Sequence, residues 1–175
     1  MSANAQRKRR RRLEAAGGYL ALQMPDHALR ELNGIDDTQD DAFEFHRLHG
    51  EALRQKERYD AALAAFERGH AIQPRSLDIL MGMAWCLKRT DQLSEAIAVM
   101  DQAYAAAPNE PVVLYNLSCY YALAGDKGAA LSWLGRALRM DGSLGRLIDG
   151  EHDFDSLRRD PHFRFIVAAG TKAHT

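Results

Sequence analysis

The chain has 175 residues, of which 46% are hydrophobic and 27% are charged, and its formal net charge is −1 at pH 7. A chain of this length and composition can form one folded domain with a sizeable core, which excludes an intrinsically disordered protein. The near-zero charge argues against nucleic acid as the partner of the whole domain, and no apolar run is long enough to cross a bilayer, so we expect no membrane insertion.

The N-terminal stretch is strongly basic. We expect residues 1–8 to be disordered, as termini without anchoring contacts usually are. Arg7–Arg12 is an unbroken run of six basic residues. The run indicates either a contact for an anion, a nucleic acid or an acidic partner, or the solvated first turn of a helix, and its place directly ahead of a helical segment favours the helix. Residues 9–42 then hold two helical segments around a turn and helix-start signal at Pro25-Asp26.

The clearest pattern lies in residues 43–76. Ala62, Phe66 and Pro74 have the A-x3-F…P spacing that closes a helix–turn–helix repeat of 34 residues. A step of 34 residues forward from Ala62 leads to Ala96 and then to Ala130, and the same step backward leads to Ala28. We expect these alanines to be buried where helices cross. The register divides the chain into a degenerate unit at 9–42 and further units at 43–76, 77–110 and 111–144.

These spacings resemble the tetratricopeptide repeat (TPR) family, most clearly over residues 43–144. The resemblance implies an all-α fold, an α-solenoid of about four helix–turn–helix repeats covering residues 9–144. It also implies that the chain binds another protein. The sequence departs from the family pattern early in each first helix, where His46, Leu80 and Leu114 stand in place of the usual large aromatic residue.

The register ends after Leu144, and residues 145–175 are expected to form capping helices and a tail. Asp160-Pro161 is a helix N-cap followed by proline at the first helical position. Phe163, Phe165 and Ile166 follow, and they are too apolar to be left in water. We therefore expect this segment to cover the exposed end of the last repeat.

The resemblance also implies a binding groove, because the first helix of each repeat lines the concave side of such arrays. Met81, Trp85, Tyr115 and Cys119 would form its apolar floor, although Trp85 and Tyr115 could instead simply pack between helices. The carboxylate clamp with which some family members grip chaperone tails is not expected, since its Lys and Asn are missing. The residues that the repeat register places in the groove are Arg47, Glu51, Arg54, Asp78, Met81, Trp85, Lys88, Arg89, Val112, Tyr115, Asn116 and Cys119.

The sequence offers no case for catalysis. It has no glycine-rich phosphate loop, no nucleophile elbow and no HExxH motif. His46 and His49 could present two metal ligands from one helix, but they fall on packing positions, so we expect structural histidines. A looser group of histidines and aspartates in the C-terminal segment (His152, Asp153, Asp155 and His162) is explained by helix capping. We expect a protein that is not an enzyme, with no metal and no cofactor.

The leading hypothesis is a non-catalytic scaffold or adaptor that holds a peptide or helix segment of a partner protein in the concave groove. Two alternatives stay open: a small bacterial secretion-type TPR chaperone for an aggregation-prone client, and an anion or nucleic-acid contact through the basic N-terminus. A homo-oligomer is a further option. The two cysteines, Cys86 and Cys119, lie in different repeats and indicate free thiols in a reducing cytoplasm. The prevalence of Ala and Arg is typical of a GC-rich bacterial genome.

Overall fold

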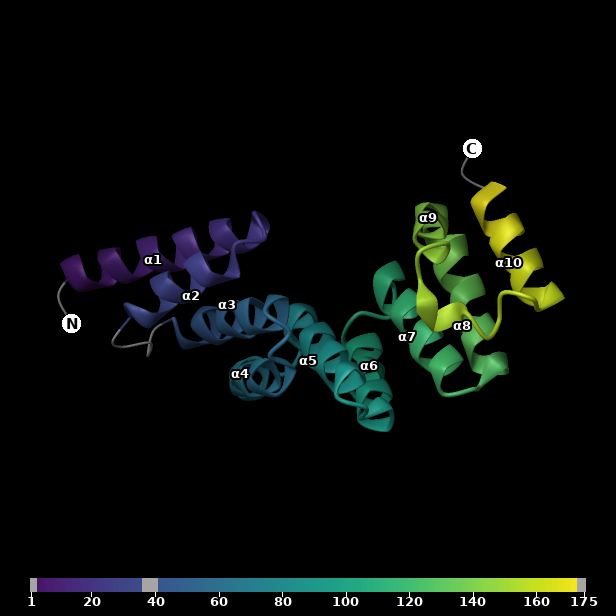
Figure 1. The fold of residues 1–175 in the computed structure, drawn as a ribbon, viewed down its shortest axis with the longest axis horizontal. Coiled ribbons are helices and arrows are strands. Elements are labelled where there is room, and N and C mark those ends of the chain that lie inside the picture. The colour runs from purple at the N-terminus through teal and green to yellow at the C-terminus, as the bar shows by residue number, and fades with distance from the viewer. Residues whose placement is uncertain (1–2, 36–40, 173–175) are drawn as a thin grey trace. The chain divides into compact units, whose positions relative to one another are not determined.

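A computed structural model describes residues 3–35 and 41–172, and within these residues the chain is helical with no strand (Figure 1). It divides into two compact units, residues 1–91 and 92–175. The first unit holds α1 (Ala3–Ala21), α2 (Pro25–Asn33), α3 (Ala42–Gln55), α4 (Tyr59–Ile72) and α5 (Leu77–Arg89). The second holds α6 (Leu93–Ala106), α7 (Pro111–Leu123), α8 (Lys127–Met140), η1 (Gly142–Leu144), α9 (Gly145–Ile148), η2 (His152–Phe154) and α10 (Pro161–Lys172).

The helix pairs expected from the repeat register follow one another along the chain as α1/α2, α3/α4, α5/α6 and α7/α8. This order confirms the all-α repeat architecture. Ala28, Ala62, Ala96 and Ala130 are each 0% exposed, which confirms that the alanines in register are buried. No helix among the described residues is long and apolar enough to span a membrane.

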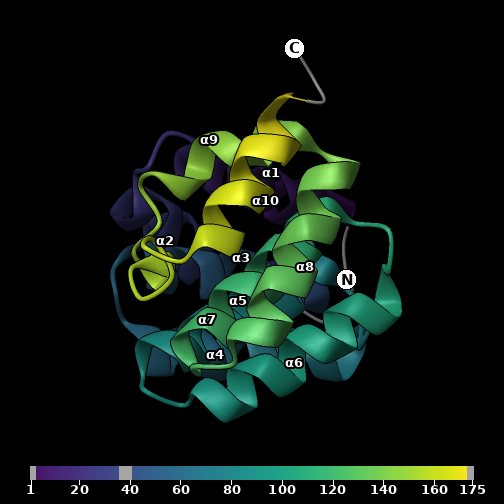
Figure 2. The ribbon, with the colours of Figure 1, turned by 90° about the vertical axis from the view of Figure 1, so that its right-hand side faces the viewer.

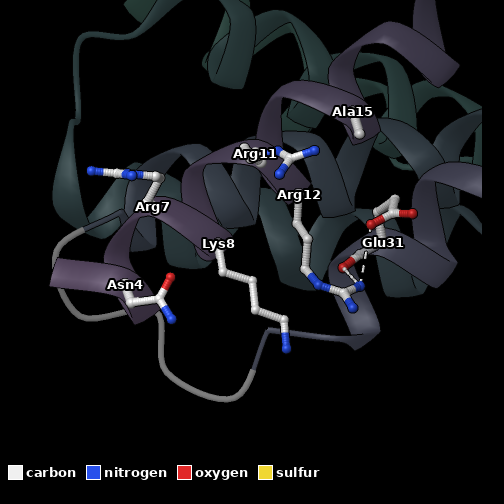
Figure 3. A pocket seen from close by; sticks show the side chains of 7 residues that line it. All are labelled: Asn4, Arg7, Lys8, Arg11, Arg12, Ala15 and Glu31. Carbon is white, nitrogen blue, oxygen red and sulfur yellow. Dashed lines mark hydrogen bonds and ion pairs between the residues drawn. The ribbon is translucent and has the colours of Figure 1, made fainter. Parts of the chain in front are cut away.

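The first helix begins earlier than the sequence suggested. Residues 3–8, which we expected to be disordered, form the first turns of α1. The reason lies in the next turns, where Arg9 is only 5% exposed and its Nε donates to Asp41 Oδ2 at 2.7 Å. Arg12 turns toward α2 and donates from Nη1 to Glu31 Oε2 at 3.2 Å (Figure 3). Tertiary anchors of this kind hold a helix whose N-terminal end would otherwise fray.

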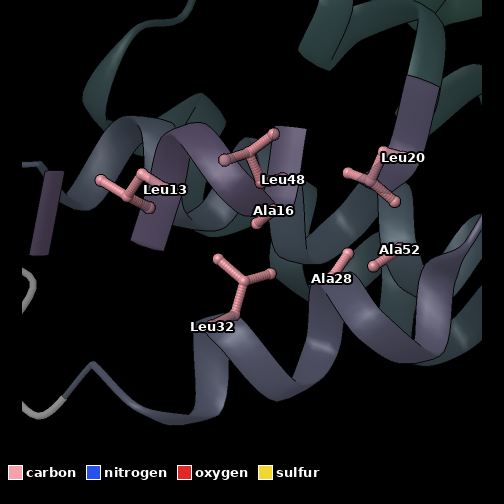
Figure 4. Close-up of a cluster of buried hydrophobic side chains, with 7 residues drawn as sticks. All are labelled: Leu13, Ala16, Leu20, Ala28, Leu32, Leu48 and Ala52. Atoms are coloured by element: carbon pink, nitrogen blue, oxygen red, sulfur yellow. The ribbon is translucent and has the colours of Figure 1, made fainter. Parts of the chain in front are cut away.

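An apolar cluster joins the first three helices (Figure 4). Leu13, Ala16 and Leu20 project from α1 at the spacing of three and four residues that places side chains on one face of a helix. They meet residues of α2 and α3. The partners in this cluster are Ala28, Leu32, Leu48 and Ala52.

Phe66 of α4 is packed between two glycines. A Cβ atom at Gly50 in α3 or at Gly82 in α5 would lie 2.6 Å from the Phe66 ring. Because that distance is too short for two carbon atoms, both positions need a residue without a side chain. The repeat's large aromatic and its small neighbours therefore fit together as one packing unit.

The turn inside each repeat has one recurring backbone conformation. Gln23, Glu57, Asp91 and Gly125, spaced 34 residues apart, have φ angles of 57°, 57°, 60° and 78°. In the turns at Gln23, Glu57 and Gly125, the next residue donates its N–H to a carbonyl oxygen five residues back, which is the closing bond of a Schellman motif. This bond joins Met24 to Tyr19 at 2.9 Å, Arg58 to Leu53 at 2.9 Å and Asp126 to Tyr121 at 3.0 Å.

In the second unit the C-terminal segment packs on the last helix pair, and α10 lies alongside α8 (Figure 2). Phe154 of η2 is fully buried, with its ring centroid 5.8 Å from that of Tyr115 and 5.4 Å from that of Phe163. Asp160 caps α10 by accepting from the N–H of His162 at 2.9 Å. Phe165, which we expected to be covered, is 73% exposed and lines a cavity together with Leu138 of α8.

Candidate functional site

The most distinctive exposed aromatic residue is Trp85, in the middle of α5. Its side chain is 38% exposed, whereas its neighbours Ala84 and Cys86 are 0% exposed. Two cations lie over its ring: Arg54 Cζ of α3 at 5.6 Å from the centroid, and Lys88 Nζ at 4.8 Å. Each cation is attracted by the quadrupole of the ring, so the two contacts help to hold the indole in place while part of it stays exposed to solvent.

The arginines of α3 are fixed by acids on the same helix. Arg54 donates from Nε and Nη2 to the two carboxylate oxygens of Glu51 at 2.8 and 2.7 Å. Seven residues earlier, Arg47 makes the same pair of bonds to Glu44 at 2.8 and 2.7 Å. These hydrogen bonds raise the pKa values of Arg47 and Arg54 above their ordinary range. Both guanidinium groups are therefore charged and oriented before any partner arrives.

The opposing helix α5 matches this spacing. Asp78 lies 3.6 Å from Arg47, and Trp85, seven residues further on, lies under Arg54. Met81 is half-buried and shares their side of the helix, since it stands three residues after Asp78 and four before Trp85. We call this surface of α3 and α5 the Trp85 face. Its members are Arg47, Glu51, Arg54, Asp78, Met81, Trp85 and Lys88.

Arg89, which the repeat register placed in the groove, lies elsewhere. Its Cζ stands 5.2 Å from the centroid of the Tyr59 ring on α4. Arg89 follows Lys88 by one residue, and one residue turns a helix by about 100°, which carries the side chain off the Trp85 face. It therefore contributes to the packing of α4 and α5.

The groove residues expected on α7 differ most from the structure. Tyr115 and Cys119 are only 3% and 2% exposed, because η2 packs on the side of α7 that carries them. Burial raises the pKa of the Tyr115 hydroxyl far above its ordinary value. Val112 and Asn116 are half-buried. In this structure Tyr115 and Cys119 are core residues, and the chain's own C-terminal segment takes the place in which we expected a partner.

Histidines that we considered as candidate metal ligands make packing or polar contacts with neighbouring residues. Burial lowers the pKa values of His46 and His49, and both rings pack on Phe45, with centroid distances of 5.4 and 5.6 Å. His152 Nδ1 lies 3.2 Å from Asp155 Oδ2. One further group among the described residues offers three ligand atoms within 4.8 Å of one another: Cys119, Glu151 and Asp153. Sequence spacing alone could not find it, because η2 brings the two acids to α7 from a distant part of the chain.

The basic residues of α1 have different environments, which we did not predict from the sequence: one is buried and others line a cavity. Arg9 belongs to the same stripe as Leu13, Ala16 and Leu20, at steps of four, three and four residues. That helical stripe was visible in the sequence and indicates an inward-facing arginine. Its neighbours Arg7, Lys8 and Arg11 instead line a cavity on α1.

Comparison with known proteins supports the repeat interpretation. A family model described as tetratricopeptide repeat matches residues 53–115. No curated protein matches the sequence. Among solved structures, MamA from Desulfovibrio magneticus RS-1 superposes with a TM-score of 0.68 at 20% identity, covering 96% of this chain and 98% of that one.

A thermophilic TPR protein of Thermus thermophilus, TTC0263, superposes with a TM-score of 0.67 at 17% identity, covering 93% of this chain and 98% of that one. At such identities the likeness is one of fold. The 34-residue register, the succession of helix pairs and the family match agree with one another. The tetratricopeptide repeat model therefore matches the central part of the chain, and the chain has the all-α fold of solved tetratricopeptide repeat proteins.

Proposed function

We propose that this protein is a non-catalytic protein–protein interaction module and that the Trp85 face holds a peptide or helix segment of its partner. The observation that carries the proposal is the 38% exposure of Trp85, whose chain neighbours Ala84 and Cys86 are 0% exposed. Tryptophan and arginine are the residue types most enriched among binding hot spots. A solvent-exposed indole flanked by two cations is therefore better explained by a partner than by the core.

The chemistry of the Trp85 face indicates the kind of segment it takes. The exposed part of the indole and the half-buried Met81 offer apolar surface for one anchoring side chain. Arg54 uses two of its five N–H donors on Glu51, which leaves donors for a carbonyl or carboxylate oxygen of the partner. We propose a segment with an apolar anchor next to an acidic residue.

Side chains of the Trp85 face are held in place before a partner binds, which favours tight binding. Because Glu51 already fixes the Arg54 guanidinium, less side-chain freedom is lost when a partner binds. The same holds for Arg47, which lies between Glu44 and Asp78. Alternating acids and bases along α3 also select register, since a shifted segment would place like charges opposite one another.

The test uses the two tryptophans as a matched pair. Trp133 in α8 also lies beside an arginine, with Arg136 Cζ at 4.4 Å, but it packs edge-on against Tyr104 in the second unit. We expect Trp85→Ala to remove partner capture from native cells, with a loss of about 2 kcal/mol or more in binding free energy and a small change in Tm. Trp133→Ala should lower Tm more and leave capture intact.

Capture is quantified by mass spectrometry of proteins retained by the tagged full chain, and affinity is then measured with the partner identified. Loss of binding by Trp85→Ala at an unchanged Tm supports the proposal. Retained binding by Trp85→Ala, or equal loss of binding by both variants, contradicts it, because the Trp85 face would then not be the contact.

A further inference from the structure

The six basic residues of α1 have different surroundings, and three of them are accounted for by the fold. Arg9 is buried against Asp41, and Arg12 is bonded to Glu31 of α2. Arg10 is exposed and donates to Glu14 one turn later at 3.2 Å. The basic run therefore contains two arginines that anchor the helix and one that pairs along its surface.

The other three share a cavity with Arg12. Figure 3 shows Arg7, Lys8 and Arg11 along one side of α1, with Glu31 at the far wall. The cavity measures about 440 Å³, within the range of about 300–1,000 Å³ typical of small-molecule sites. No ion pair joins Arg7, Lys8 or Arg11 to any residue that the structure describes. Among the described residues, the lining of this cavity therefore holds four cations and one carboxylate.

Helix geometry makes this arrangement unfavourable without a ligand. Arg7 and Arg11 stand four residues apart, as do Lys8 and Arg12, and like charges at that spacing repel. They lie in the second and third turns of α1, and the first turn ahead of them holds no acidic residue that could offset their charge. An anion bound in the cavity would relieve this repulsion.

We propose that this cavity binds a compact phosphate-bearing anion of the oligophosphate class. Guanidinium groups match phosphate oxygens in pairs, and the Lys8 ammonium adds a point charge beside them. Several adjacent cations favour a ligand with more than one phosphate over a single phosphate. The side-chain amide of Asn4, which also lines the cavity, adds a neutral donor.

Two observations favour a compact anion over a nucleic acid. Four of the cations line one open cavity on one helix, whereas nucleic-acid sites follow the backbone along an extended stripe of positive charge. The formal net charge of −1 also gives the whole chain no long-range attraction for a polyanion. The site lies in the first unit on α1, and it does not depend on the Trp85 face.

The experiment is a calorimetric titration of the full chain with inorganic tripolyphosphate at low salt. Wild type is compared with Lys8→Gln/Arg11→Gln, which removes two cavity cations. Arg10→Gln is the control variant, because Arg10 is exposed and does not line this cavity. Arg7→Gln/Arg10→Gln is compared with Arg10→Gln, and the difference in affinity between the two measures the contribution of Arg7. Circular dichroism checks that α1 is retained in each variant.

We expect wild type to bind tripolyphosphate with an affinity that falls with salt, and Lys8→Gln/Arg11→Gln to lose about tenfold or more in affinity. Arg10→Gln should lower the affinity for tripolyphosphate by less than about twofold, and Arg7→Gln/Arg10→Gln should lower it further. Absence of binding by wild type overturns the proposal, as does an equal loss with Arg10→Gln, which would show diffuse attraction. A single-stranded oligonucleotide that displaces tripolyphosphate and binds more tightly would also overturn it, in favour of nucleic acid.

Discussion

The guanidinium of Arg54 in α3 lies over the Trp85 indole in α5, with Cζ 5.6 Å from the ring centroid, while Glu51 holds the same guanidinium from its own helix. One cation thus joins a carboxylate and an aromatic ring across two neighbouring repeats. The contact couples the packing of α3 and α5 to the order of the proposed binding surface. It also makes that surface sensitive to single substitutions away from the tryptophan.

Glu51→Gln should weaken partner binding more than it weakens the fold. Glutamine offers one oxygen and no charge, so Arg54 loses its bidentate clamp and becomes free to leave the indole. Because both side chains are about 30% exposed, the stability change should be within about 1 kcal/mol. Partner dissociation, measured by surface plasmon resonance, should be several-fold faster. Glu44→Gln, which frees Arg47 instead, should have the smaller effect, and the reverse order would contradict the role assigned to Arg54.

Gly82→Ala should destabilise the first unit. The added Cβ would come within 2.6 Å of the Phe66 ring, which is fully buried and cannot move aside, so a loss of about 1–3 kcal/mol is expected from overpacking. Gly18→Ala is the control, since nothing lies within 4 Å of a Cβ there and alanine favours a helix by about 1 kcal/mol. Urea unfolding should move the two midpoints in opposite directions. An unchanged midpoint for Gly82→Ala would mean that Phe66 packs differently.

Glu57→Gly should stabilise the protein, although it removes a side chain. Glu57 has a φ of 57°, which costs a non-glycine residue about 1–2 kcal/mol, and this exceeds the entropy of about 0.4–1 kcal/mol that glycine adds to the unfolded chain. Gly125 occupies the equivalent turn with a φ of 78°, so Gly125→Ala should have the opposite effect and lower the stability by a similar amount. Thermal unfolding measures the Tm of both variants against that of the wild type. A lower Tm for Glu57→Gly would show that its side chain contributes more than the strain costs.

Stability should fall as the pH drops below about 6.5. Burial lowers the pKa of His46 and of His49 in the folded state, and nearby Arg68 lowers both further. The unfolded chain, with an ordinary histidine pKa of about 6.5, then binds protons before the folded chain does. The stability that the neutral histidines provide is therefore full above that pH and is lost as the pH falls through their folded pKa values. His46→Gln/His49→Gln should show a flatter profile of Tm between about pH 7.5 and 5.5, and an unchanged slope would contradict this account.

The repeat architecture was predictable because its signals are local and recur. Ala62, Phe66 and Pro74 mark a helix crossing, a packing aromatic and a helix end within a few turns of one another, and the alanine recurs at the same interval along the chain. Each repeat therefore confirms the register of the others. The helix ends follow the same rule, since α4 stops at Ile72, two residues before Pro74.

The candidate site was predictable only in part. Trp85 and Arg54 come together because neighbouring repeats place equivalent helices side by side, and register alone gives that contact. Tyr115 and Cys119 could not be assigned in this way, because their burial depends on where a segment outside the register docks. The backbone strain at Glu57 could not be predicted from the sequence either. Left-handed turn positions are usually marked by Gly, Asn or Asp, and Glu57 is none of these.

The two cysteines are distributed so that each compact unit contains one, Cys86 in the first and Cys119 in the second, and both are buried thiols. Burial raises the pKa of Cys86 to about 11, so at neutral pH almost none of it is the reactive thiolate. An alkylating reagent can then modify either thiol only when the unit around it opens. Pulse alkylation followed by peptide mass spectrometry would report the opening of each unit separately in the unmodified protein, and so would show whether the two halves of this repeat array unfold together or one at a time.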